Sequence, residues 1–204
     1  MAKATVTGGT PRAWQRMLSG RRLDLLDPSP LDVEVADIAH GLARMARWNG
    51  QTRGAHIFSV AQHSLLVEAV MREQITRMTD RAGLAALLHD SPEHVIGDMI
   101  SPFKAVIGNA YKMVERRLLA AIHMRFGLPA ELDPKMTKAI KNADMAAAYL
   151  EATRLAGFAE ADAKRLFGRD PCLPLEMEAE YLTPWSASKA ERRFLARFEV
   201  LKAG

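Results

Sequence analysis

Apolar residues recur along most of this chain at spacings of three and four, which is the pattern of α-helices that bury one face. Leucine, alanine and methionine dominate these positions, rather than the β-branched and aromatic residues that favour strands. The pattern predicts one helix that starts near Asp32, one over 59–75 and one that runs from a Thr79 cap through His89. Two more helices are predicted over 101–126, with Gly108 as a weak point, and over 133–156. A capping box at Ser188 and Glu191 predicts a final helix.

Turn-forming residues separate these helices and are frequent towards both ends of the chain. Residues 11–18 are expected to form a short helix, and the turn-rich "SGRRLDLLDPSPLDV" to hold a small extended excursion. A short helix is expected between Pro92 and Gly97, because proline suits a first turn and glycine a helix end. We therefore predict an all-α, single-domain bundle of roughly seven or eight helices over residues 1–204, with a motif-bearing core at 32–156 and peripheral elements at 1–31 and 157–204.

Composition narrows the functional classes. The 204 residues include 25% charged residues and carry a formal charge of +4, which suits an anionic substrate but is too small to indicate a nucleic-acid binder. The single cysteine, Cys172, excludes an internal disulfide and a zinc site built from several cysteines. No run of 18 apolar residues and no signal-like start are present, so we expect a cytoplasmic protein that does not span a membrane.

Several polar residues stand at positions that face the core. His63 shares its helix face with Val60 and Leu66, so its ring points inward. A buried neutral imidazole bonded to a carbonyl is the ordinary explanation for one such histidine. His89 and Asp90 end the apolar run "AGLAALL", where both side chains can line one cavity. A buried carboxylate there needs a cation, a histidine proton or a metal.

Asp144 interrupts the apolar pattern of "AIKNADMAAAYL", and the neighbouring alanines allow another helix to approach closely. A salt bridge between helices would explain Asp144 equally well. Together, however, His63, His89, Asp90 and Asp144 supply two imidazoles and two carboxylates from three helices. This mixed set suits one divalent transition metal ion (Mn²⁺, Co²⁺, Zn²⁺, Fe²⁺ or Ni²⁺) better than Ca²⁺, and such an ion converts a bound water into a nucleophile.

The order and spacing of these residues resemble the HD superfamily of metal-dependent phosphohydrolases. "HDSPEHVIGDMISPFK" is similar to a motif of bacterial 5′-deoxynucleotidases in that superfamily, and "ADMAAAYLEA" to the helix of their fourth ligand. "IAHGLARMARWNGQTRGAHIFSVAQHSLLV" resembles the neighbouring branch that includes phage-type dATP triphosphohydrolases. The resemblance extends from about Asp37 to Glu151, and implies an HD-type helical fold and hydrolysis of a nucleotide.

The resemblance also implies roles for individual residues. The metal ligands would be His63, His89, Asp90 and Asp144. Glu93 would handle the proton of the attacking water or the leaving group, and Asp98 would contact the sugar or assist proton transfer. From the residues alone, Glu93 is equally a first-turn glutamate favoured by the helix dipole, and Asp98 a cap of the helix at Ser101.

Arg47 and Trp48 stand where the 5′-deoxynucleotidases that this chain resembles carry an Arg-Trp pair at the substrate site, and Lys104 is expected to reach a phosphate. Arginine binds phosphate through two N–H groups, tryptophan packs on a sugar or base, and lysine supplies a point charge. The alternatives are a helix-end arginine beside a core tryptophan and a lysine facing solvent. His94 departs from the motif and is not assigned as a ligand.

These observations predict a metal-dependent phosphohydrolase acting on a deoxynucleoside mono- or triphosphate. A cyclic-nucleotide phosphodiesterase, a hydrolase of a guanosine polyphosphate alarmone and a catalytically silent nucleotide sensor stay open as alternatives. Nucleic-acid binding is disfavoured because the arginine pairs are scattered. A homodimer is expected by analogy with relatives.

Overall fold

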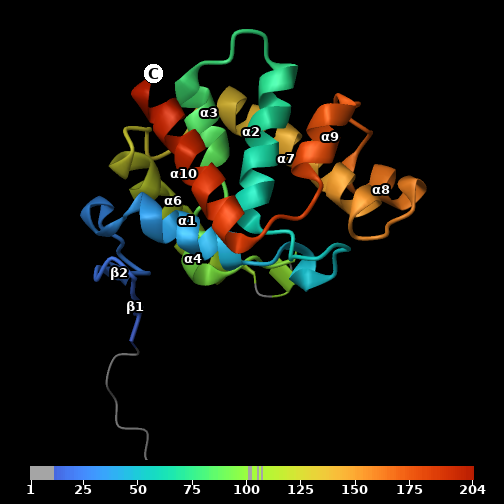
Figure 1. Ribbon diagram of the computed structural model, residues 1–204. Helices are drawn as coiled ribbons and strands as arrows, with labels where there is room; N and C mark the ends of the chain where they lie inside the picture. Colours follow the sequence, from blue (N-terminus) through green and yellow to red (C-terminus); the bar gives the residue numbers. More distant parts are fainter. Residues whose placement is uncertain (1–11, 101–102, 105, 107) are drawn as a thin grey trace, which may run out of the picture.

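The computed structural model describes residues 12–100, 103, 104, 106 and 108–204. Within them the chain forms a two-stranded hairpin, two short 3-10 helices and nine α-helices packed as a bundle (Figure 1). The all-α prediction is confirmed. The elements are β1 (Trp14–Arg16), β2 (Arg22–Asp24), η1 (Pro30–Asp32), α1 (Val35–Arg44), η2 (Arg47–Gly50), α2 (Val60–Gln74), α3 (Asp80–Leu87), α4 (Glu93–Ile96), α6 (Asn109–Arg125), α7 (Pro134–Arg154), α8 (Glu160–Phe167), α9 (Leu175–Tyr181) and α10 (Ala187–Ala203).

Helix α2 is the centre of the bundle. Every residue from Val60 to Met71 is buried, because α1, α3, α7, α9 and α10 all pack against this helix. A helix covered on all sides normally carries apolar residues around its whole circumference. The buried Gln62, His63, Ser64 and Glu68 are therefore exceptions that need polar partners.

The C-terminal segment joins the same core. Phe194 and Phe198 of α10 are fully buried, and Gln62 of α2 donates hydrogen bonds to the carbonyl oxygens of Tyr181 and Thr183. Helices α8 and α9 lie together on one side of the bundle, away from the N-terminal hairpin (Figure 1). Residues 157–204 therefore contribute to the core of the bundle. That the chain forms a single domain stays a prediction.

Most predicted helix starts are confirmed by their caps. The hydroxyls of Ser59 and Thr79 accept hydrogen bonds from the first turns of α2 and α3, and the Asp133 carboxylate does the same for α7. Gly97, at φ 82°, ends α4 as expected. The predicted start at Ser101 and Pro102 lies outside the described residues.

Three expectations about the ends of the chain are corrected. Residues 12–18 do not form a helix: Trp14 pairs with Asp24 in an antiparallel hairpin, where the Arg12 and Arg22 guanidinium groups cover its ring. Helix α10 starts two residues earlier than the expected capping box, with Ser186 as the cap in place of Ser188. The weakly patterned stretch after residue 157 contains α8 and α9, so the described helices outnumber the seven or eight expected. None of the described helices is long and apolar enough to cross a membrane.

Candidate metal and substrate site

His63 lies in the first turn of α2 with its ring fully buried. Its Nδ1 is 2.5 Å from Oε1 of Glu151, so the Nδ1–H donates to that carboxylate. Nε2, on the other side of the ring, is 3.4 Å from both Asp90 Oδ2 and Asp144 Oδ1. The carboxylate of Glu151 therefore fixes the ring so that Nε2 faces two further acids.

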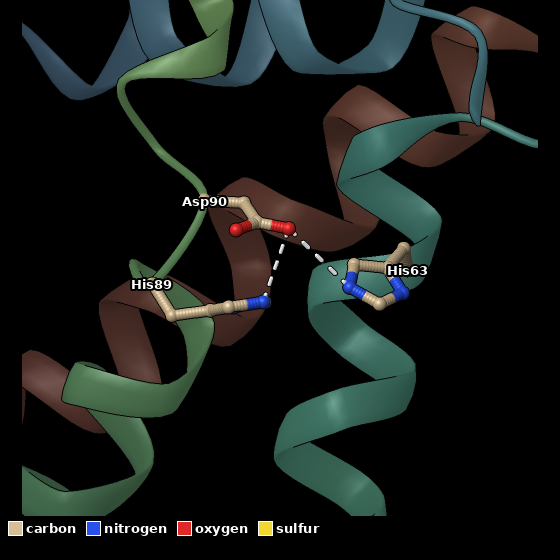
Figure 2. A group of neighbouring side chains, drawn as sticks. All are labelled: His63, His89 and Asp90. Atoms are coloured by element: carbon tan, nitrogen blue, oxygen red, sulfur yellow. Dashed lines mark ion pairs between the residues drawn. The ribbon is translucent and has the colours of Figure 1, made fainter. Parts of the chain in front are cut away.

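His89 and Asp90 follow α3 directly, at the point where the helix ends and the chain turns (Figure 2). The His89 Nδ1–H donates to the carbonyl oxygen of Ala86 at 2.9 Å. Its Nε2 is consequently free to face Asp90 Oδ2, 3.1 Å away. Both imidazoles thus use Nδ1 as the anchored donor and present Nε2 to the same carboxylate.

The donor set fits a metal ion. The Nε2 atoms of His63 and His89 are buried and have no hydrogen-bond partner in the described part of the chain. Ligand atoms of His63, His89 and Asp90 all lie within 4.8 Å of one another. Bond lengths of about 2.0–2.2 Å place the donors of one transition metal ion roughly 3–4 Å apart. Two imidazoles anchored through their other nitrogen are the usual state of metal-binding histidines.

Asp144 adds a carboxylate from α7 to this group. Its Oδ1 faces His63, and its Oδ2 accepts a 2.7 Å hydrogen bond from Lys141, a largely exposed residue one turn earlier. The structure thus brings together all four residues predicted as ligands, from α2, the end of α3 and α7. Their role as ligands stays a prediction.

The charges of these groups are strongly coupled. Burial and the charge of Arg47 act to lower the pKa of His63, but the carboxylates of Glu151, Asp144 and Asp90 outweigh them and raise it. Burial opposes the ionisation of Asp90, yet the nearby histidines hold its pKa well below the usual value. The pocket around Nε2 of His63 is therefore built to attract positive charge.

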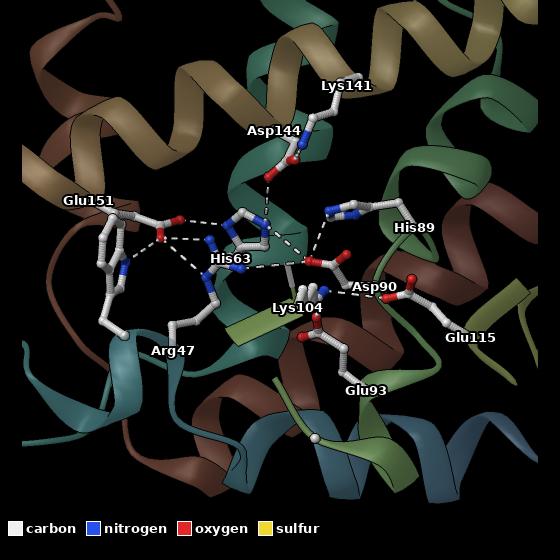
Figure 3. Close-up of polar contacts among 12 residues, drawn as sticks. Arg47, His63, His89, Asp90, Glu93, Lys104, Glu115, Lys141, Asp144 and Glu151 are labelled. Carbon is white, nitrogen blue, oxygen red and sulfur yellow. Dashed lines mark hydrogen bonds and ion pairs between the residues drawn. The ribbon is translucent and has the colours of Figure 1, made fainter. Parts of the chain in front are cut away.

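Glu93 begins α4 next to this group and is buried. Burial, reinforced by the charges of Asp90 and Asp98, raises the pKa of Glu93 to about 9. Lys104 Nζ lies 3.6 Å from the Glu93 carboxylate and 3.3 Å from that of Glu115 (Figure 3). The Glu93 carboxyl therefore holds a proton at neutral pH beside a lysine cation.

Asp98 lies in the half-buried segment that follows α4. Burial raises its pKa, and its charge also reaches Arg47 and Glu93. The structure thus places Asp98 near the site, while its predicted contact with a sugar stays a prediction. The alternative role as a cap of the Ser101 helix falls on residues outside the described range.

Arg47 and Trp48 sit in η2, and both side chains bind Glu151. Arg47 donates from Nε and Nη2 to Glu151 Oε2 at 3.2 and 3.1 Å, and Trp48 donates from Nε1 to the same oxygen at 2.8 Å. The Arg47 Nη1 reaches within 3.7 Å of Asp90. Burial works against the charge of Arg47, but Glu151, Asp98 and Asp90 outweigh it and raise its pKa. A permanent cation therefore stands at the edge of the candidate metal site.

The backbone of η2 is unusual. Trp48 and Asn49 have φ values of 56° and 50°, in the left-handed region that residues other than glycine seldom adopt. The Trp48 ring also packs against Phe158 and Phe167, with ring centroids 5.5 and 5.7 Å away. Trp48 therefore has features of both a core residue and a site residue, because its ring joins an aromatic cluster while its Nε1 donates to Glu151 at the site.

Sequence reasoning missed Glu151, whose carboxylate contacts His63, Arg47 and Trp48. Glu151 lies seven residues after Asp144, two turns further along α7 and on the same face. A charged residue on the face that already carries Asp144 was the signal that could have identified it. His94, by contrast, donates from Nδ1 to the carbonyl oxygen of Ser91 and packs closely on Gly41, which indicates a structural role.

A cavity of about 570 Å³ opens beside the candidate metal site. His89 and Asp144 line it on one side, its walls include Leu119, Leu132 and Ile140, and its lining also includes Arg116, Glu131 and Lys141. Its volume is within the range of small-molecule sites, and it combines apolar walls with several charged groups.

Comparison with known proteins decides the family. The model of the YfbR-like 5′-deoxynucleotidase family matches residues 37–159, more than half of the chain. The chain belongs to this family. Membership confirms the predicted relation to 5′-deoxynucleotidases and the prediction of an enzyme of the hydrolase class.

Two individual proteins are similar to this chain. An uncharacterised protein of Rhodobacter capsulatus is 55% identical over 191 residues, which cover 93% of this chain and 96% of that protein. The solved structure of a cyanophage S-2L HD phosphohydrolase, bound to dA and one catalytic Zn²⁺ ion, covers 84% of this chain and 98% of its own, with 20% identity and a TM-score of 0.48.

Proposed function

We propose that the protein hydrolyses the phosphate ester of a deoxynucleoside 5′-monophosphate with the aid of one divalent transition metal ion. The observation that carries this proposal is the pair of buried Nε2 atoms of His63 and His89, which face Asp90 beside the cation of Arg47. Family membership supports the substrate class, because the matching model describes 5′-deoxynucleotidases.

His63, His89, Asp90 and Asp144 would hold the ion. When bound, such an ion supplies an activated water and polarises the phosphoryl group. The remaining steps fall to residues of the chain. Arg47 compensates the negative charge of the phosphate, and Lys104 adds a second cation. The buried carboxyl of Glu93 holds a proton at neutral pH. Glu93 is therefore suited to deliver that proton to the leaving sugar oxygen.

A cavity next to these groups supports a position for the nucleoside. The cavity beside His89 and Asp144 is large enough for a sugar and a base, and its walls are mostly apolar. A phosphate at the metal would leave the nucleoside pointing towards Leu119, Leu132 and Ile140. Asp98 and Trp48 do not line this cavity, so a contact of either residue with the substrate would be made on the Arg47 side of the site.

A panel of substrates tests the proposal. Purified protein is freed of metal, then supplied with Mn²⁺, Co²⁺ or Zn²⁺ and assayed for phosphate release from deoxynucleoside and ribonucleoside 5′-monophosphates and from deoxynucleoside triphosphates. We expect release from deoxynucleoside monophosphates, and its loss in His63→Ala. Release of pyrophosphate or triphosphate would assign the protein to a triphosphohydrolase activity, and tight binding without turnover would favour a nucleotide sensor.

The oligomeric state needs a separate measurement. Met113 and Met124 of α6 are each about half exposed, and apolar side chains of this kind are available to a second copy. We expect a homodimer, and light scattering coupled to gel filtration would distinguish it from a monomer.

A further inference from the structure

We propose that Glu151 is a positioning residue that ties the metal-binding side of the site to the substrate-binding side. It does so through its two oxygens, one on His63 and the other on Arg47 and Trp48. This inference rests on the proposed function and assigns a residue that the motifs did not identify.

The carboxylate is divided between the two sides (Figure 3). Oε1 accepts from Nδ1 of His63 at 2.5 Å, and Oε2 accepts from two nitrogens of Arg47 at 3.1 and 3.2 Å and from Nε1 of Trp48 at 2.8 Å. The Glu151 side chain is 0% exposed, so water does not compete for these bonds. Each partner is a donor, and only an ionised carboxylate can accept from all of them at once.

On the metal side, Glu151 controls which nitrogen of His63 is available. A proton on Nδ1, held by Oε1, leaves the lone pair of Nε2 directed at Asp90 and Asp144. Helix α7 supplies both Asp144 and Glu151, two turns apart, so one rigid helix holds the His63 ring from its two sides. Partners of this kind, hydrogen-bonded to a ligating histidine, typically change metal affinity 10–100-fold.

On the substrate side, Glu151 holds a strained turn. Trp48 and Asn49 adopt the left-handed conformation, which is energetically unfavourable for residues other than glycine. The hydrogen bonds from Arg47 and Trp48 to Oε2 offset that cost and aim Arg47 Nη1 towards Asp90. Without Glu151 the turn is free to relax, and Arg47 would leave the phosphate position.

The substitution Glu151→Gln tests both sides with almost no change in volume. If the amide oxygen faces Arg47 and Trp48, the amide NH₂ faces His63 Nδ1, which must then give up its proton and place it on Nε2. If the oxygen faces His63, the NH₂ meets the N–H groups of Arg47 and Trp48. Either orientation breaks one of the two connections, because glutamine cannot accept at both ends.

Two other variants separate positioning from simple stability. Arg47→Met removes only the substrate side. Glu68→Gln is the matched control, since Glu68 is also buried, lies on α2 five residues after His63, and accepts from two arginines, Arg72 and Arg197. Metal affinity is measured by calorimetric titration of metal-free protein with Mn²⁺, KM and kcat with a deoxynucleoside monophosphate, and folding by thermal melting.

We expect Glu151→Gln to weaken Mn²⁺ binding 10–100-fold and to raise KM at saturating metal at least 10-fold. Arg47→Met should raise KM without weakening Mn²⁺ binding, because it removes a positive charge from beside Asp90. Glu68→Gln should lower the melting temperature and leave both binding constants within twofold of the wild type.

The inference is overturned if folded Glu151→Gln binds Mn²⁺ as the wild type does, or if Glu68→Gln reproduces its losses. Should Glu151→Gln not fold, Glu151→Asp keeps the charge but withdraws the oxygens by about 1.5 Å, one C–C bond. Wild-type Mn²⁺ affinity in folded Glu151→Asp would then overturn it. A wild-type protein that binds none of Mn²⁺, Co²⁺ and Zn²⁺ would instead refute the proposed function.

Discussion

Replacing Glu93 with glutamine should stabilise the metal-free protein while it removes activity. The Glu93 side chain is 3% exposed, and its Oε2 has no hydrogen-bond partner among the described residues. Burial, then the charges of Asp90 and Asp98, raise its pKa from 4.5 to about 9. Glutamine resembles the protonated carboxyl in size and is neutral at every pH. It therefore fits the folded protein without the free-energy cost of keeping a proton bound.

The size of the effect follows from the two pKa values. A group whose pKa is raised on folding contributes stability that is complete below pH 4.5 and is lost as pH rises through about 9. At pH 7 the unfolded chain has released this proton and the folded chain retains it. The interval from 4.5 to 7 corresponds to roughly 3 kcal/mol at about 1.4 kcal/mol per unit, and joint titration with Asp98 reduces it. We expect Glu93→Gln to be about 1–3 kcal/mol more stable at pH 7.

Urea unfolding of metal-free protein at pH 4.5, 7 and 8.5 measures this difference. The gap between Glu93→Gln and the wild type should be smallest at pH 4.5 and widen towards pH 8.5. Glu199→Gln, at an exposed position of α10, is the control and should stay within about 0.5 kcal/mol of the wild type throughout. A gap that does not change with pH, or a less stable Glu93→Gln, would refute the reasoning. With metal and substrate, kcat should fall about 10²–10⁴-fold.

Four further outcomes are expected. Asp144→Asn should weaken Mn²⁺ binding at least 10-fold in a calorimetric titration, and unchanged binding would exclude it as a ligand. Arg47→Lys should raise KM about 10-fold in steady-state assays, because lysine cannot donate in parallel from two nitrogens. Gly41→Ala should lower the free energy of unfolding by about 1–3 kcal/mol in urea, since its Cβ would lie 2.8 Å from the His94 Cβ and 2.9 Å from its carbonyl oxygen. Mn²⁺ affinity should be weaker at pH 6 than at pH 8, because the raised pKa of His63 makes a proton compete with the metal; equal affinities would contradict this.

The helices that carry the four predicted ligands could be located from sequence because their signals are local. Ser59 and Thr79 cap helices whose apolar spacing is regular, so the inward direction of His63 followed from helical geometry alone. The meeting of His63 with Asp144, however, depends on how α2 and α7 cross. Helical periodicity did not supply that pairing: the residue types suggested it, and the family resemblance supported it.

Features that depend on long-range contacts were not predictable in the same way. The 47–50 turn takes left-handed backbone angles because Glu151, about a hundred residues later, accepts its side-chain hydrogen bonds. The helix expected over 11–18 failed for a related reason: Trp14 pairs with Asp24 across a hairpin, where Arg22 of the second strand covers its ring, and helical spacing does not reveal such a partner. Local propensity is overridden where distant side chains supply stronger partners.

The raised pKa of His63 and its proposed role as a ligand have one physical cause. Asp90, Asp144 and Glu151 surround a fully buried ring, and buried carboxylates are costly unless positive charge lies between them. In the absence of metal, a proton on Nε2 supplies that charge. A divalent ion supplies twice as much at the same place and satisfies the carboxylates better. Arg47 neutralises only part of this negative charge, because its guanidinium is hydrogen-bonded to Glu151 and comes no closer than 3.7 Å to Asp90. A small divalent ion at Nε2 would neutralise the rest.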